Sequence, residues 1–327
     1  MKSSRINRRI LMIAGAGLTL TSVATGQPRT PRVVKIVVGF PPGQATDIVA
    51  RLLAEQLKTI TGDQYIVDNK PGQGGSIAMG QVARSPADGS VMMLTHMSAV
   101  AATPHMYKSV PYDPLKDFEA VGLLGDLPFV LVCHPSLPFN NVTDLVRYAR
   151  QHPGRLSHAS SGNGTVSHLA MEALKRRAGI EMLHVPYRGS APGLTDVVAG
   201  QVSVALETAA AVRPFVQAGQ LKALGTGTPQ RMAAFPGVGT IAEQGFDGFS
   251  ASTWLMVIYP AHTDKALVGS MHDALNKAMH KPEIEARMLQ LGAIPRFSAH
   301  PSEAGAYIRS EFVHWGEVVR QSKVTLD

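Results

Sequence analysis

Beyond the N-terminal region, apolar residues follow two alternating patterns. Short runs rich in β-branched residues, such as 33–38, are typical of buried strands, and apolar residues every three to four positions are typical of amphipathic helices. After the first run, Leu53 and Leu57 share one helical face, and Gly62 follows where such a helix would end. Strand and helix patterns in regular alternation predict an α/β fold with mostly parallel sheets and helices on both faces.

The alternation occurs in two stretches, which are joined by apolar runs at 129–133 and 254–259. We expect these runs to carry the chain between two lobes, because 327 residues exceed the usual size of one hydrophobic core. The predicted division places 27–128 and 253–327 in lobe 1, and 129–252 in lobe 2. Hinged lobes commonly bind ligands in the cleft between them.

The N-terminus has the parts of a secretory signal: basic residues up to Arg9, an apolar run at 10–23, and small residues after it. We expect cleavage near residues 24–27, which makes 1–26 the signal peptide and the mature protein soluble and exported. A membrane anchor is the alternative, yet the apolar run is shorter than the ~20 residues that a span needs. The Arg8-Arg9 pair also permits twin-arginine export, so the export route stays open.

Charge and cysteine content narrow the function further. The formal net charge is +7, but Lys2, Arg5, Arg8 and Arg9 lie in the predicted signal, so 7 − 4 = +3 remains. No basic stripe interleaved with aromatic residues follows, which argues against nucleic acid as a partner. Cys133 is the only cysteine, so no internal disulfide can form.

Motifs for catalysis, cofactors and metals are absent from the sequence. No serine has glycine at both −2 and +2, no Gly-Lys-Ser/Thr ends a phosphate loop, and the glycine pairs at 72/74 and 162/164 lack a third glycine. The twelve histidines include no His-Glu-x-x-His run, and His168 with Glu172 is a lone helical pair. We therefore predict no catalytic residue, no cofactor and no metal. An exported hydrolase that uses Ser161 as its nucleophile is the alternative.

A Gly-rich turn between a strand and a helix occurs twice, at 39–47 and at 160–165. Free backbone N–H groups at a helix N-terminus carry partial positive charge, so a carboxylate placed there gains hydrogen bonds and dipole attraction. Ser161 and Thr165 could add hydroxyl donors. Each loop alone could also be an ordinary tight turn, with Thr165 as N-cap and Asp47 complementing the helix dipole. Two such loops on facing lobes could hold an anion together.

Further candidates lie at strand ends and in a third loop. Arg188 could fork onto a carboxylate. Thr95 ends a strand, together with His96 and Ser98, where open α/β sheets bind ligands. Glu207 also ends a strand, but an acid there would repel an anion unless an amine or hydroxyl of the ligand met it. The predicted ligand-binding residues are Phe40, Pro42, Gly43, Gln44, Ala45, Thr46, Asp47, Thr95, Ser161, Gly164, Thr165, Val166, His168, Tyr187 and Arg188.

Several ordered motifs are familiar. They are Gly-Phe-Pro-Pro-Gly-Gln-Ala-Thr-Asp at 39–47, Asn-Lys-Pro-Gly-Gln-Gly-Gly at 69–75, Asp-Gly at 88–89, Pro-Tyr-Asp-Pro at 111–114 and Val-Pro-Tyr-Arg-Gly-Ser-Ala-Pro at 185–192. In order and spacing they resemble the Bug/TctC family of tripartite tricarboxylate transporter substrate-binding proteins. The resemblance covers essentially the whole mature chain.

The resemblance implies a two-lobe periplasmic binding protein fold of type II and a solute-binding receptor in the periplasm, without catalytic activity. It also implies a small carboxylate ligand, such as an organic acid, an acidic amino acid or an aromatic acid. The implied partners are membrane subunits of a tripartite tricarboxylate transporter. A ligand sensor for a membrane signalling partner is a further alternative.

In the family, the loop after the first strand and the helix-start loop of the second lobe clasp the ligand carboxylate, which corresponds to 39–47 and 160–168 here. The family usually has a Gly-Gly pair in the first loop, whereas this chain has Gly43-Gln44. A side chain therefore stands where the backbone would otherwise approach closely.

Overall fold

Strands and helices alternate along residues 30–322, which the computed structural model describes, with side chains to 320. The strands are β1 (Val33–Val38), β2 (Gln64–Asn69), β3 (Val91–His96), β4 (Phe118–Cys133), β5 (Ser157–Ser160), β6 (Leu183–Pro186), β7 (Val204–Thr208), β8 (Lys222–Thr226), β9 (Ser252–Pro260) and β10 (Ile294–Pro295). The helices are α1 (Ala45–Thr61), α2 (Ser76–Val82), α3 (Val142–Gln151), α4 (Val166–Ala178), α5 (Ser190–Val198), α6 (Ala209–Gln217), α7 (Lys265–Met279), α8 (Pro282–Gln290) and α9 (Pro301–Ser322). Short helical turns are η1 (Gln73–Gly75), η2 (Ser98–Ala102), η3 (Thr103–His105) and η4 (Ala242–Gln244). The strand predicted at 33–38 is β1, and Gly62 ends α1 in a left-handed conformation, φ 77°.

Two groups of parallel strands are joined through antiparallel ones. In one group β1 lies between β2 and β3, and in the other β5 lies between β6 and β7. The complete order is β2-β1-β3-β9-β4-β7-β5-β6, with β8 and β10 also paired to β4. Parallel neighbours require helical crossovers, which is why the alternating pattern in the sequence predicted them. The sheet is mixed because β4 and β9 are antiparallel to their neighbours.

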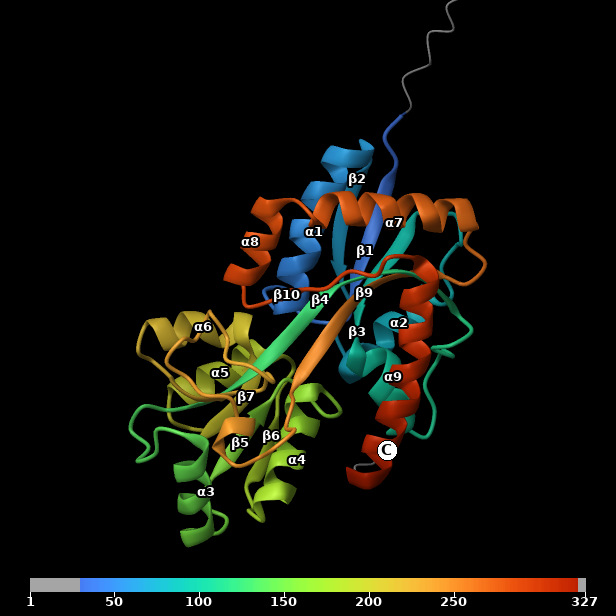
Figure 1. The fold of residues 1–327 in the computed structure, drawn as a ribbon. Coiled ribbons are helices and arrows are strands. Elements are labelled where there is room, and N and C mark those ends of the chain that lie inside the picture. The colour runs from blue at the N-terminus through green and yellow to red at the C-terminus, as the bar shows by residue number, and fades with distance from the viewer. Residues whose placement is uncertain (1–29, 323–327) are drawn as a thin grey trace, which may run out of the picture. The chain divides into compact units, whose positions relative to one another are not determined.

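The long strands β4 and β9 lie side by side and link the two groups (Figure 1). Strand β4 pairs with β9 as far as Pro128, which lies opposite Ser252. From Phe129 onward β4 pairs with β7 and β8 instead. The apolar run at 129–133 is thus only the end of a strand that begins at Phe118. Glycine, aspartate and proline interrupt the earlier part of β4, so its sequence pattern is weak there.

Both faces of β1 are buried in its last three residues, which fixes the loop that follows it. Val34 and Ile36 pack in one core with Leu53 of α1, whereas Val37 faces a second core that contains Met79 of α2. Burial on both faces is the usual state of parallel strands, and it removes freedom from the carboxyl end of the strand. The start of α1 is therefore held firmly against the sheet.

Helix α9 is tied to β9 through one carboxylate. The indole nitrogen of Trp254 on β9 donates a hydrogen bond to Glu311 Oε2 at 2.8 Å, and that of Trp315 donates to the same oxygen at 3.2 Å. Tyr307 packs edge-on against the Trp254 ring, with centroids 5.7 Å apart. These are the two tryptophans of the sequence, and both lie at the contact between α9 and β9.

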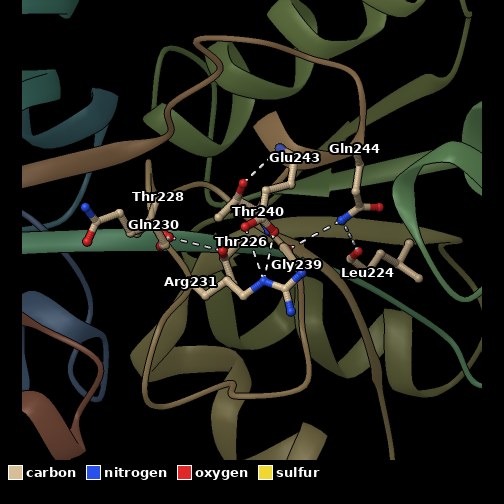
Figure 2. Close-up of polar contacts among 9 residues, drawn as sticks. All are labelled: Leu224, Thr226, Thr228, Gln230, Arg231, Gly239, Thr240, Glu243 and Gln244. Atoms are coloured by element: carbon tan, nitrogen blue, oxygen red, sulfur yellow. Dashed lines mark hydrogen bonds and ion pairs between the residues drawn. The ribbon is translucent and has the colours of Figure 1, made fainter.

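The loop between β8 and β9 is built on paired polar groups (Figure 2). Thr240 and Glu243 form a reciprocal capping box, in which each side chain accepts the other's backbone N–H at 2.9 Å. Arg231 Nε donates to Glu243 Oε2 at 2.9 Å, and Gln244 Nε2 donates to the carbonyl of Leu224 at 3.0 Å. This network fixes η4 and the chain that enters β9.

The predicted signal peptide and its cleavage site at 24–27 lie outside the described residues. Within residues 30–322, no helix is long and apolar enough to cross a membrane. The division of the chain into lobes at 128 and 252 stays a prediction, although β4 changes pairing partners at the first of these positions.

Candidate ligand-binding site

A small cavity lies where strand ends and helix starts of both strand groups meet. Its wall is formed by the loop into α1, the end of β3, the point where β4 changes partners, the starts of α4 and α5, the end of β7 and the start of β9. The lining residues are Phe40, Gln44, Ala45, Thr46, His96, Ser98, Leu127, Phe129, Ser161, Thr165, Val166, Ser190, Glu207, Thr208 and Thr253.

Three of the helices that begin at this cavity have their N-cap residue in its lining. Gln44, Thr165 and Thr208 are the N-cap residues of α1, α4 and α6, and all three line it. None of these three side chains bonds to its own helix start. The first-turn N–H groups therefore lack the side-chain acceptors that usually satisfy them, and three positive dipole ends meet at one place.

Buried polar atoms without partners surround the same space. Both ring nitrogens of His96 and the hydroxyls of Thr208 and Thr253 have no hydrogen-bond partner among the described residues. His96 is 1% exposed and stacks on Phe40, with centroids 4.4 Å apart. Burial lowers the pKa of His96 to about 3, so its neutral ring offers one donor and one acceptor. Buried orphan groups are costly, which points to a polar ligand.

A chain of hydrogen bonds crosses one side of the cavity. Gln44 Nε2 donates to Ser190 Oγ at 3.0 Å, and Ser190 Oγ donates to Glu207 Oε2 at 2.6 Å. Burial raises the pKa of Glu207 to about 7, although hydrogen bonds from Ser190 and Ser161 oppose the rise. Among the lining residues there is no lysine or arginine. An anion here would be met by backbone N–H groups and hydroxyls.

Seven of the fifteen residues predicted from sequence line the cavity. They are Phe40, Gln44, Ala45, Thr46, Ser161, Thr165 and Val166. They come from the two Gly-rich loops that the sequence singled out, which now face one space. Pro42 and Gly43 are exposed in the first loop and do not line the cavity.

Asp47 holds the first loop in shape. Its carboxylate accepts hydrogen bonds from Arg51 at 2.9 Å, from Asn69 at 3.0 Å and from the N–H of Gly43 at 2.8 Å. Burial works against ionisation, but the bonds from Arg51, Gly43 and Asn69 outweigh it and lower the pKa of Asp47. The side chain is fully engaged away from the cavity.

The hydroxyl of Thr165 is engaged within its own loop. It donates to the carbonyl of Gly162 at 2.7 Å and lies 2.9 Å from Ser167 Oγ. Thr165 is thus the N-cap residue of α4, as the alternative expected, but its side chain accepts no hydrogen bond from the helix start. Ser161 Oγ also contacts Ser167 Oγ, at 2.9 Å. Ser161, Thr165 and Ser167 form one hydroxyl cluster at the start of α4.

The remaining predicted residues lie outside the cavity lining. Thr95 Oγ1 contacts Met79 Sδ at 3.3 Å, Tyr187 donates to Asp196 at 2.5 Å, and Arg188 is exposed.

Gly164 and His168 support the start of α4 from behind. The N–H of Gly164 donates to His168 Nδ1 at 3.2 Å, and the His168 ring stacks on His184, with centroids 4.1 Å apart.

The predicted set did not include eight of the lining residues. His96 and Ser98 share the strand end from which only Thr95 was selected, and Glu207 was set aside because of its charge. The others are Leu127, Phe129, Ser190, Thr208 and Thr253. Ser190 stands in a quoted motif and Thr208 ends a strand, so these two had a sequence signal. Leu127, Phe129 and Thr253 reach the site only through the pairing of β4 and β9.

Comparison with solved structures identifies the class of protein. The R. palustris protein Rpa4515, solved with adipate, has a TM-score of 0.87 at 32% identity and covers 90% of this chain and 98% of its own. The periplasmic binding protein BugD has a TM-score of 0.85 at 31% identity, covering 91% and 99%. MatC from Rhodopseudomonas palustris, solved with bound malate, has a TM-score of 0.82 at 28% identity, covering 88% and 99%. The fold is thus the two-lobe α/β fold of periplasmic binding proteins.

Sequence comparison gives the family. Residues 49–324 match the tripartite tricarboxylate transporter family receptor, TctC. A UPF0065 protein from the tcbD-tcbE intergenic region of Pseudomonas sp. (strain P51) is 37% identical, covering 95% of this chain and 93% of that protein. Protein BugT of Bordetella pertussis is 33% identical, covering 97% and 96%. The chain belongs to the Bug/TctC family of solute-binding receptors. The family is one of receptors and its solved neighbours are periplasmic binding proteins, so the chain is not an enzyme, and the hydrolase alternative falls.

Proposed function

We propose that this receptor captures a small organic carboxylate in the cavity described above. The observation that carries the proposal is the meeting of three helix N-termini with the unpartnered polar atoms of His96, Thr208 and Thr253. Two structural relatives were solved with adipate and with malate, which are both carboxylates. The ligand class is therefore a small organic acid.

Micromolar binding requires several of these donors at once. A charge-assisted hydrogen bond contributes about 1.5–3 kcal/mol net, and a micromolar dissociation constant corresponds to about 8 kcal/mol. The N–H groups at the starts of α1 and α4 would hold the carboxylate, with Thr208 and Thr253 adding hydroxyl donors. Phe40, Phe129 and neighbouring apolar side chains would cover the carbon skeleton.

Isothermal titration of the purified mature protein tests the ligand class. The panel contains succinate, malate, adipate, glutamate and benzoate, with succinamide as a neutral analogue of equal length. We expect at least one acid to bind in the micromolar range and to raise the unfolding temperature by a few degrees, while succinamide has no effect. Absence of binding by every acid, or equal binding of succinamide, would contradict the proposal.

We further propose that the protein acts in the periplasm and delivers its ligand to membrane subunits of a tripartite tricarboxylate-type transporter. Membership of the receptor family of that transporter supports this partnership. Uptake of the labelled acid should be lost in cells that lack this gene and restored by the full-length chain. Cell fractionation should recover the restored protein with periplasmic markers. Unchanged uptake, with binding intact in vitro, would favour a sensor role.

A further inference from the structure

Gln44 extends its side chain across the cavity from the start of α1 to the start of α5. It is 7% exposed and lines the cavity. Its amide lies beside Gly189, where an added Cβ would stand 3.2 Å from Gln44 Nε2 and 3.1 Å from Pro41 Cγ. The backbone of the loop at Gly189 is therefore packed closely against the Gln44 side chain, with no room for a larger residue at 189.

The polarity of the hydrogen-bond chain fixes the amide in this position. Ser190 Oγ spends its proton on Glu207, so toward Gln44 it can only accept, and the amide N–H is the matching donor. A ligand that pushed Gln44 aside would leave a buried amide and a buried hydroxyl without partners, which is costly. The Gln44 side chain is thus a fixed part of the cavity wall, and its displacement is energetically costly.

We propose that Gln44 sets the length of the acid that the receptor accepts. This inference rests on the proposed function, because it concerns the same cavity. The propanamide group of Gln44 takes up space between the starts of α1 and α5, so it leaves less room for a longer unbranched α,ω-dicarboxylate than for a compact acid. A glycine at this position would free that space. Each further methylene that gained apolar contact there would strengthen binding by about fourfold.

The backbone at this position favours a clean test. Gln44 has φ −74° and ψ 161°, which glycine adopts freely, and glycine is an acceptable N-cap. Gln44→Gly should therefore keep α1 and the fold while it removes the wall. Gln44→Asn keeps an amide on a shorter side chain and serves as a second variant. Gln201→Ala, at an exposed position, is the matched control.

The experiment measures dissociation constants for dicarboxylates from malonate to suberate by isothermal titration. We expect the wild type and Gln201→Ala to prefer the same short acid. Gln44→Gly should shift the preferred length upward by at least one methylene and gain about tenfold for the longer acid relative to the shorter. Gln44→Asn should lie between.

Two results would overturn the inference and are distinguishable. If the wild type and Gln44→Gly both bind acids with the same order of preference, Gln44 does not select length and the proposed function stands. If the wild type binds no acid in the series or in the wider panel, the proposed function fails and this inference fails with it.

Discussion

The loop of residues 226–244 and the wall of the cavity both contain buried polar side chains, but the wall leaves several of them without a partner. In the loop, the hydroxyls of Thr226 and Thr228 lie 3.1 Å apart, and Thr228 donates to the carbonyl of Gln230 at 2.6 Å (Figure 2). Glu243 accepts bonds from a guanidinium and from a backbone N–H. These polar groups stabilise the path of the chain.

In the cavity wall, His96, Thr208 and Thr253 keep polar atoms without partners among the described residues. A buried unpaired group costs about 1–3 kcal/mol. Such a cost is reasonable only where another molecule supplies the missing bonds. The contrast separates polar groups that hold the fold from polar groups that recognise a ligand, and it can be tested by changing one region at a time.

The largest effect is expected from Gln244→Ala in the loop. Gln244 Oε1 accepts the N–H of Val142 at 2.6 Å, and its Nε2 donates to Leu224, so truncation leaves buried backbone groups unpaired. We expect a loss of about 2–3 kcal/mol in the free energy of unfolding, measured with urea. Ligand affinity of the folded protein should not change. The exposed Gln217→Ala is the control, and equal stability of the two variants would contradict the contrast.

A rise in pH from 6 to 8 should lower the affinity of the cavity for its acid by about tenfold. The pKa of Glu207 is about 7 in the structure, so its carboxyl is largely neutral at pH 6 and ionised at pH 8. A bound carboxylate favours the neutral form, and affinity should therefore fall as pH rises through 7. Titrations at pH 6 and pH 8 measure this. The side chain of the Glu207→Gln variant cannot ionise, so the affinity of this variant should not change with pH. If its affinity still falls as pH rises, a group other than Glu207 causes the pH dependence.

Thr253→Val should weaken ligand binding by about fivefold without loss of stability. The Thr253 hydroxyl has no partner among the described residues, so its removal breaks no bond of the free protein. Thr228→Val is the matched change in the loop, where the hydroxyl is bonded, and it should lower stability and leave binding intact. Calorimetric titration measures the ligand affinity of both variants, and thermal unfolding measures their stability. If both variants lose the same property, binding or stability, the contrast between the loop and the cavity wall is wrong.

The smallest effect is expected from Thr165→Val. Its hydroxyl donates to the carbonyl of Gly162 and is not free to serve a ligand as donor. We expect binding to weaken by only about two- to threefold, through a looser loop at the start of α4. A loss of tenfold or more in titration, with an unchanged unfolding temperature, would show that Thr165 contacts the ligand directly.

The sequence carried enough local information to predict both Gly-rich loops. A Gly-rich turn followed by an amphipathic pattern marks the start of α1 and of α4, and Gln44, Ser161 and Thr165 from these loops meet at the cavity. Local pattern also predicted β1 and the end of α1 at Gly62. Such features depend on neighbours in the chain, which a single sequence displays.

The rest of the site depends on long-range pairing. Phe129 and Thr253 reach the cavity because β4 changes from β9 to β7 and β8 at this point, and no local pattern marks that register. Glu207 was set aside on electrostatic grounds that treat it as a charged group. Burial changes that condition by raising the pKa of Glu207 to about 7, and burial depends on the folded chain.

The shared carboxylate of Glu311 gives the protein an optical signal of its own. Trp254 follows Thr253 on β9, so its backbone adjoins the cavity wall while its indole lies on the opposite face of the strand. The indole of Trp315 donates to the same Glu311 oxygen as that of Trp254. Because the sequence holds no further tryptophan, all tryptophan emission originates at this contact. A ligand that binds Thr253 and shifts β9 should change the surroundings of the Trp254 indole on the other face, so fluorescence can follow capture of the acid in real time without a label.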